Sequence, residues 1–338
     1  MKLLLTGASG FIGSHILEHV LTNTDWDVVC IASWKHKGTP ERIEEVLNGH
    51  KDWKKRVEVI THDLQSPFTT RTVERIFASG GIEYIVNAAA ESHVDRSITD
   101  PVPFIKNNVD LMLNMLALAR VCVPRLKAFL QVSTDEVYGA APEGVNHPEW
   151  SSIIPSNPYS ASKACQEAIA ISYWRTYGVP IIITNTMNNF GEMQDSEKYI
   201  AKAIRQISKG EKVTVHGTQE HIGSRYYLHA RNHADAILFI LKNIKPLQYE
   251  DDVPSPVRFN VVGDIELNNL EVVQEIGKVL GKPIDYEFVD FHATRPGHDR
   301  RYALDGSLLK GAGWKPPFNF HDSLKKYIEW TLKHPSWL

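Results

Sequence analysis

The chain has 338 residues, of which 43% are hydrophobic and 23% are charged, a composition typical of a globular protein. Its formal net charge of −3 gives no broad basic field, so nothing supports nucleic-acid binding. The three widely spaced cysteines predict neither a disulfide framework nor a metal site, and no apolar run reaches the roughly 18–20 residues of a membrane span. We therefore expect a cytoplasmic protein.

Short apolar runs separated by helical patterns fill the first half of the chain. Runs that are apolar at nearly every position are typical of strands buried on both faces of a parallel sheet. Their alternation with helices predicts an α/β fold with a doubly wound parallel sheet. The predicted strands are residues 2–6, 27–32, 56–60, 84–88, 129–133 and 180–184.

A glycine-rich segment, residues 6–13, follows the first predicted strand and opens a helix. Glycines permit a tight turn and let the backbone approach a pyrophosphate, to which the helix N-terminus offers free N–H groups. Three spaced glycines are a weak signal alone, but their place between strand and helix makes this copy strong. The segment predicts a dinucleotide cofactor held by Gly7, Gly10, Phe11, Ile12 and Gly13.

The acidic residue expected after the second strand, where it would bind the adenosine ribose, is missing. Ser33 lies there instead, with Lys35 and Lys37 close by, a combination that suits a 2′-phosphate. The cofactor is therefore NAD or NADP, and we expect NADP to be accepted at least as well; the alternative is that both lysines are ordinary solvated loop residues. Asp63 and Leu64, after the third strand, are candidates for contacts with the adenine, although Asp63 is equally explained as a turn residue.

Two groups of polar residues indicate catalysis. Tyr159 and Lys163 share one face of a helix that Asn157 is expected to cap. An adjacent ammonium and the positive charge of the nicotinamide are expected to favour the phenolate and lower the tyrosine pKa. Residues 133–139 end the preceding strand with a hydroxyl and two consecutive acids, Thr134, Asp135 and Glu136. Because the carboxyl end of such a strand faces the cofactor crevice, all five side chains are expected in one site, and a mere turn with solvated acids explains them less well.

The second half of the chain is richer in His, Arg, Pro and Gly. We expect residues 1–190 to form a dinucleotide-binding Rossmann domain and residues 191–338 to form mainly a smaller C-terminal α/β substrate-binding lobe. A predicted helix at 231–241 and a predicted strand at 259–262 would return to the main sheet, so that about 228–265 also joins the first domain.

Four motifs appear in one order along nearly the whole chain: residues 89–98, 133–139, 157–163 and 295–303. With the glycine-rich start, they resemble those of the extended short-chain dehydrogenases/reductases, and specifically of the nucleotide-sugar 4,6-dehydratases that act on dTDP-glucose or UDP-glucose. The Asp-Glu pair is the discriminating feature, since related epimerases and decarboxylases generally lack it. Residues 188–195 and 219–227 match the family only loosely, and both segments lie where sugar or base would be bound.

This resemblance implies an NAD(P)-dependent lyase that oxidises C4 of the sugar, removes water across C5 and C6, and reduces C6 with the same cofactor. Tyr159 with Lys163 would deprotonate the 4-hydroxyl while Thr134 binds its oxygen. Glu136 would be the C5 base and Asp135 the acid for the 6-hydroxyl. Further cofactor contacts are expected at Ala88, Ala90, Tyr159 and Lys163. Substrate contacts are expected at Ser92, His93, Arg96, Asn189, Lys198, Arg225, Arg295 and His298.

Two other functions remain open at this point. One is a nucleotide-sugar epimerase or 5,6-dehydratase of the same superfamily, and the other is a non-enzymatic nucleotide-sensing relative. The sensing role is disfavoured because Tyr159, Lys163, Thr134 and the acid pair are all present. A structural role for His93 is as well supported as a role in binding sugar. The resemblance also implies a homodimer formed through the helices at 108–120 and 159–177.

Overall fold

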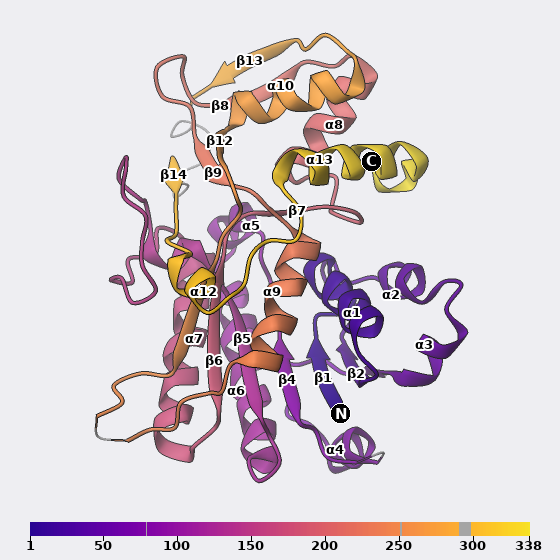
Figure 1. Cartoon of the computed structure of the whole chain (residues 1–338), viewed down its shortest axis with the longest axis vertical. Coiled ribbons are helices and arrows are strands. Elements are labelled where there is room, and N and C mark those ends of the chain that lie inside the picture. The colour runs from indigo at the N-terminus through magenta and orange to yellow at the C-terminus, as the bar shows by residue number, and fades with distance from the viewer. Residues whose placement is uncertain (79, 251, 291–298) are drawn as a thin grey trace.

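The computed structural model describes residues 1–78, 80–250, 252–290 and 299–338 (Figure 1). Within these residues the largest sheet has seven strands, all parallel, in the order β11-β6-β5-β4-β1-β2-β3. This is a Rossmann-type sheet, and the strand order reverses between β1 and β4, where a ligand crevice is expected at the carboxyl ends. The strands are β1 (Lys2–Thr6), β2 (Asp27–Ala32), β3 (Val57–Thr61), β4 (Tyr84–Asn87), β5 (Ala128–Thr134), β6 (Ile181–Thr186) and β11 (Val257–Val261).

Alternate residues of each strand point to opposite faces of the sheet. Helices pack on both faces and cover these side chains. Leu3 and Leu5 of β1 lie in the core shared with α1 (Phe11–Asn23) and α9 (Ala230–Asn243), which pack together. Leu4, between them, lies in the core shared with α6 (Pro101–Cys122) and α7 (Pro158–Tyr177). The shorter helices near the sheet are α2 (Pro40–Leu47), α3 (Lys51–Arg56), α4 (Thr70–Phe77), α5 (Val94–Thr99) and α12 (Ser307–Gly311).

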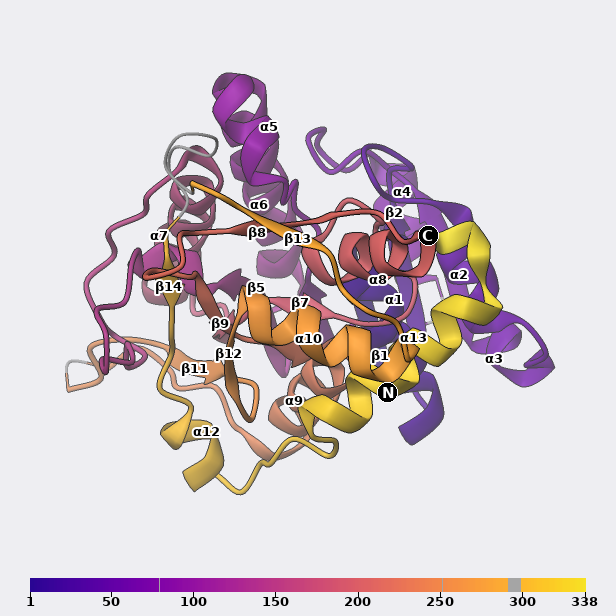
Figure 2. The ribbon, with the colours of Figure 1, turned by 90° about the horizontal axis from the view of Figure 1, so that it is seen from above.

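A smaller lobe lies beyond the carboxyl ends of the strands, at the top of Figure 1, and Figure 2 shows it from above. Its core is formed by side chains such as Phe190, Ile204, Val272 and Phe320. Its helices are α8 (Tyr199–Lys209), α10 (Asn269–Leu280) and α13 (Phe320–Lys333), followed by the short η2 (Pro335–Trp337). Its strands pair as β7 (Asn189–Phe190) with β10 (Leu228–His229), β8 (Val213–His216) with β13 (Tyr286–Val289), and β9 (Ser224–Tyr226) with β12 (Glu266–Asn268) and β14 (Arg301–Tyr302).

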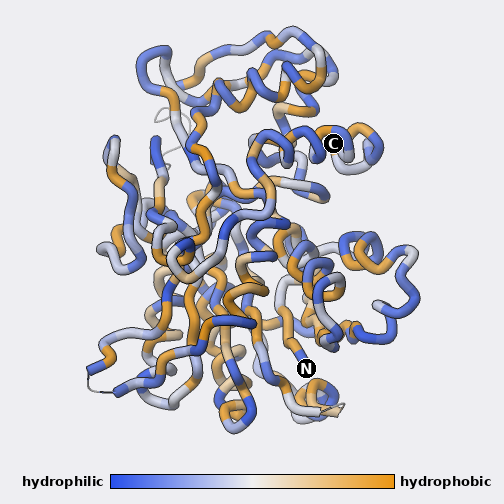
Figure 3. The backbone as a smooth tube through the Cα atoms, in the orientation of Figure 1, coloured by the Kyte–Doolittle hydropathy of each residue, from blue (hydrophilic) through white to orange (hydrophobic). Residues whose placement is uncertain are grey.

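The backbone elements follow the sequence pattern closely. The predicted strand at 259–262 is found as β11 at the sheet edge, and the predicted helix at 231–241 is α9. Apolar segments in Figure 3 concentrate in the strands of the sheet, as expected for strands buried on both faces. Among the described residues, no helix is both long and apolar enough to cross a bilayer. The proposed division of the chain near residue 190 stays a prediction.

Candidate active site

The glycine-rich turn after β1 packs tightly against the segment after β4. Gly7 has φ +78°, and a Cβ there would come within 2.9 Å of the backbone nitrogen of Ala89. Gly10 precedes α1 without a side-chain hydrogen bond to the helix, so the first N–H groups of α1 are left for another acceptor. Thr6 Oγ1 accepts a hydrogen bond from the Ala89 N–H over 3.1 Å. This backbone cradle fits the pyrophosphate of a dinucleotide.

The two lysines that the sequence offered to a 2′-phosphate both have acidic partners. Lys35 Nζ lies 2.5 Å from Asp63 Oδ2. Lys37 Nζ lies 3.2 Å from Glu197 Oε2 and 3.8 Å from Asp195 Oδ1. Both ammonium groups are about half exposed, so these pairs are weak individually. Both lysines are therefore already paired with acidic side chains and are not free cations for a 2′-phosphate.

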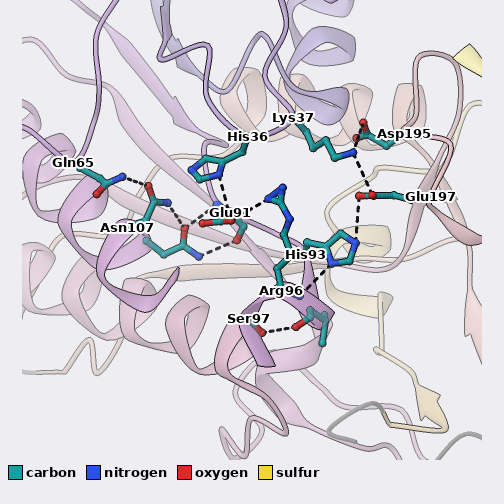
Figure 4. A network of polar contacts seen from close by, with 12 residues as sticks. His36, Lys37, Gln65, Glu91, His93, Arg96, Ser97, Asn107, Asp195 and Glu197 are labelled. Carbon is teal, nitrogen blue, oxygen red and sulfur yellow. Dashed lines mark hydrogen bonds and ion pairs between the residues drawn. The ribbon is translucent and has the colours of Figure 1, made fainter. Parts of the chain in front are cut away.

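Figure 4 shows that the Lys37 pair belongs to a network around the crevice. Glu197, in the segment before α8, also lies 3.3 Å from His93 Nε2 at the start of α5. Glu91 Oε1 lies 3.3 Å from both Arg96 Nη1 and His36 Nδ1. His93 and Arg96, predicted to bind substrate, thus contact acidic side chains that line the same opening.

The candidate catalytic residues come together at the carboxyl end of β5. The strand ends at Thr134, and Asp135 and Glu136 begin the short helix η1 (Asp135–Tyr138). Thr134 Oγ1 donates to Asp135 Oδ1 over 2.9 Å, and its side chain also shares a hydrogen bond with Tyr159. Lys163 Nζ donates to the carbonyl of Val132 over 2.8 Å. One hydroxyl therefore links the tyrosine to the acid pair.

The two acids differ in their surroundings. Asp135 is 4% exposed, and burial together with the charge of Glu136 raises its pKa to about 7. Burial also raises the pKa of Glu136, but Asn157 Nδ2 donates to its Oε2 over 3.1 Å and favours the ionised form. Tyr302 OH donates to the same oxygen over 3.4 Å. Two neighbouring carboxyl groups in such different surroundings can divide the roles of acid and base.

In the protein alone the pKa of Tyr159 is not lowered, and the lowering expected from Lys163 together with the nicotinamide charge stays a prediction. Burial raises the pKa of Tyr159, and the charges of Glu136 and Asp135 raise it further. The ammonium of Lys163 is engaged with Val132 and, over 2.6 Å, with Gln166 Oε1. Burial lowers the pKa of Lys163 to about 8. The spacing of Tyr159 and Lys163 predicted that they share one helical face. It did not show that burial beside two acids makes ionisation of the tyrosine unfavourable.

The predicted substrate residues divide into three groups. Arg225 and Lys198 lie near the acid pair, since the field of each favours the carboxylate of Glu136. Among the described residues, Arg225 donates three of its five N–H groups, to the carbonyls of residues 224, 299 and 300. The Asn189 side chain is bound to Thr186, the Met187 carbonyl and His233, and Ser92 is exposed. Arg295 and His298 lie outside the described residues.

Sequence reasoning missed several residues that hold this site. Asn157 was identified only as a helix cap; its Oδ1 does accept from the Ser160 N–H over 2.9 Å, while its amide nitrogen binds Glu136. Tyr302 lies within the last motif, residues 295–303, and could have been found there. Glu167 and Arg258 gave no signal, because a lone acid in a helix and a lone arginine in a strand look like surface residues.

The chain is similar to known proteins over nearly its whole length. Residues 4–327 match the family model described as GDP-mannose 4,6 dehydratase. The chain is 33% identical over 360 residues to dTDP-glucose 4,6-dehydratase 1 of Escherichia coli, covering 100% of this chain and 94% of the relative. It is also 33% identical to the low-salt glycan biosynthesis protein Agl12 of Haloferax volcanii, covering 98% and 99%. A dTDP-glucose 4,6-dehydratase of Streptomyces venezuelae, solved with NAD and dTDP bound, matches with TM-score 0.86 and 29% identity over 100% of this chain and 98% of that one.

Proposed function

The chain belongs to the GDP-mannose 4,6-dehydratase family, and we propose that it converts dTDP-glucose, or the UDP-activated equivalent, to the 4-keto-6-deoxy sugar. It is an NAD(P)-dependent enzyme of the Rossmann type. The observation that carries the proposal is the Asp135–Glu136 pair, joined to Tyr159 through the Thr134 hydroxyl. Oxidation at C4 needs the tyrosine, whereas removal of water across C5 and C6 needs an acid and a base on the same side of the sugar. The choice of dTDP-glucose rests on the activities named for the relatives.

The bound cofactor supplies the hydride acceptor for C4 and the hydride donor for C6. Tyr159 removes the proton from the 4-hydroxyl. The ammonium of Lys163, one helical turn away, favours the phenolate that this transfer needs. Thr134 places a hydroxyl between Tyr159 and Asp135, where it binds the C4 oxygen as that oxygen becomes a carbonyl.

The acid pair acts in the second step. The C4 carbonyl acidifies the proton on C5, and Glu136 takes that proton as the base. Asn157 and Tyr302 hold the Glu136 carboxylate at Oε2, so Oε1 is directed elsewhere for the transfer. Asp135, whose pKa of about 7 keeps it partly protonated at neutral pH, gives its proton to the departing 6-hydroxyl. The water that leaves is the 6-hydroxyl group with the Asp135 proton. Glu136 returns its proton to C5 when C6 is reduced, and the proton that Tyr159 took from the 4-hydroxyl replaces the one lost by Asp135.

Cations near the acid pair suit the diphosphate of the substrate. Arg225 stacks on Tyr302, with its guanidinium carbon 4.4 Å from the ring centre. Lys198 begins α8 and acts electrostatically on both Glu136 and His93. Arg295 and His298 complete the proposed set through the family motif. Arg is suited to bidentate contact with phosphate oxygens.

A panel of nucleotide sugars tests this proposal directly. The protein would be incubated with dTDP-glucose, UDP-glucose and GDP-mannose. Mass spectrometry would detect the loss of one water, and absorbance in alkali would detect the 4-keto-6-deoxy product. Water loss from dTDP-glucose with formation of that chromophore supports the proposal. Epimerisation at C4 without water loss, or a 5,6-unsaturated product without reduction at C6, would replace it with the corresponding superfamily activity.

We also propose a homodimer formed through α6 and α7, which pack side by side on one face of the sheet. Apolar side chains remain exposed on and beside these helices, including Leu113 at 40%, Val121 at 68% and Tyr177 at 41%. Exposed apolar surface of this kind is typical of a protein interface. Light scattering should give twice the chain mass of 38.2 kDa. Leu113→Arg should shift the protein toward monomer, and a native monomer would refute the proposal.

A further inference from the structure

A fully buried ion pair lies behind the catalytic residues. Arg258 of β11 and Glu167 of α7 are 2% and 0% exposed, and Arg258 Nη2 lies 2.8 Å from Glu167 Oε2. Placing two charges in a protein interior is expensive, and replacing such a pair by apolar residues often leaves stability unchanged or improves it. The pair is therefore weakly explained as a contribution to stability.

The contacts of Glu167 lead to the end of β5. Its Oε1 accepts hydrogen bonds from Ser133 Oγ and, over 2.8 Å, from Asn185 Nδ2. Asn185 Nδ2 also donates to the carbonyl of Thr134 over 3.0 Å. Glu167 thus binds the side chain of Ser133 directly. Through Asn185 it is also connected to the backbone of Thr134, the last residue of β5.

The contacts of Arg258 lead to the other end of η1. Its Nη1 donates to Tyr138 OH over 3.0 Å, and Tyr138 OH in turn donates to the carbonyl of Glu149. The guanidinium carbon also lies 4.1 Å from the centre of the Trp150 ring. Because η1 runs from Asp135 to Tyr138, the ion pair holds the two acids between a fixed strand end and a fixed tyrosine.

Glu167 is also one helical turn beyond Lys163, and its negative charge favours the ammonium form of that lysine. The ammonium of Lys163 itself donates to two neutral acceptors, the carbonyl of Val132 in β5 and Oε1 of Gln166 in α7. The buried carboxylate of Glu167 therefore contacts β5, at whose end the two acids lie. It also favours the charged form of Lys163, the lysine that assists Tyr159.

We propose that Glu167 and Arg258 are positioning residues for the reaction, which together fix Thr134 and the acid pair and set the charge balance at Lys163. This inference rests on the proposed function for its catalytic consequence, but its electrostatic part belongs to the protein itself. Neither residue is placed in contact with substrate. Their loss should therefore lower the rate of the chemical step and leave substrate binding nearly unchanged.

Loss of the Glu167 charge and loss of the Arg258 charge should shift the pKa of Lys163 in opposite directions. Glu167→Gln keeps the size of the side chain and an acceptor for Ser133 but removes the negative charge, so the ammonium of Lys163 should lose its proton at lower pH. Arg258→Met removes the positive charge that balances Glu167, so Lys163 should hold its proton to higher pH. The double variant should return toward the native value.

Nuclear magnetic resonance of protein labelled with 13C at lysine Cε measures this titration without substrate, and Lys163→Met assigns the signal. Single-turnover reduction of the bound cofactor by dTDP-glucose should fall about 10- to 100-fold in either single variant, the range expected when reacting groups are misplaced by about 1 Å. Substrate affinity from calorimetry should stay within about twofold of native. Arg258→Lys, which keeps the charge, should recover part of the rate.

Ile276→Val, in the core of the lobe, serves as the control for general destabilisation. It should shift the urea midpoint and leave both the Lys163 titration and the turnover unchanged. The inference is overturned if the two single variants leave the Lys163 titration unmoved or move it in the same direction, or if they turn over at the native rate. A native protein inactive on every nucleotide sugar would refute the proposed function instead, and the titration would still decide the electrostatic part.

Discussion

Replacement of Asp135 by asparagine should stop dehydration while C4 oxidation continues. The asparagine carbonyl can still accept the hydrogen bond that Thr134 Oγ1 donates over 2.9 Å, so the hydroxyl that contacts Tyr159 keeps its place. The amide has no acidic proton for the leaving hydroxyl, and the loss of a catalytic proton transfer slows a step by about 10²–10⁴-fold. We expect reduced cofactor to form at the native rate and then persist, while loss of water slows by that factor.

The pH dependence of the native enzyme gives a second measure of the same group. Burial, with the charge of Glu136, raises the pKa of Asp135 to about 7. The Asp135 carboxyl can donate a proton at pH values below its pKa. It loses this ability as the pH rises through the pKa. Its protonated fraction falls from about one half near pH 7 to about one tenth near pH 8, so dehydration should slow about fivefold over that interval. Asp135→Asn should abolish this dependence.

Stopped-flow absorbance near ~340 nm follows cofactor reduction, and quenched samples give the water loss by mass. Asp322→Asn, at the exposed N-terminus of α13, is a control for the same chemical change away from the site. If Asp135→Asn releases the 4-keto-6-deoxy product at the native rate, Asp135 is not the proton donor. If instead cofactor reduction is lost as well, the variant has disturbed Thr134 and the separation of the two steps fails.

Three further outcomes follow from the site. Tyr159→Phe should reduce C4 oxidation by about 10²–10⁴-fold with nucleotide-sugar affinity retained in calorimetry, and near-native turnover would remove the tyrosine from the mechanism. A nicotinamide dinucleotide should be found in the supernatant of denatured pure protein, because a cofactor that is reduced and reoxidised in each turnover has no need to leave; its absence, with none needed for activity, would contradict this. The sequence predicts that NADP is accepted at least as well as NAD, but the pairing of Lys35 with Asp63 leads us to expect tighter binding of NAD; equal affinities would show that this pair opens readily for a 2′-phosphate.

Short-range pattern was sufficient for much of this protein. The apolar runs predicted the strands of the main sheet, and the glycines at 7, 10 and 13 predicted the turn that β1 and α1 enclose. The spacing of Tyr159 and Lys163 predicted a shared helical face behind the Asn157 cap. These features depend on periodicity, backbone freedom and capping, which are properties of neighbouring residues. The strand-end acids could also be placed, because parallel strands direct their carboxyl ends to one edge.

Tertiary structure decided the electrostatics. The pairing of Lys37 with Glu197, and of Arg258 with Glu167, joins segments that are far apart in the chain, and nothing local marks either partner. The raised pKa of Tyr159 in the protein alone could not be read from the sequence, because burial beside two acids outweighs the favourable effect of a nearby lysine. A pKa depends on desolvation and on every charge within several ångströms, and those distances exist only once the chain has folded.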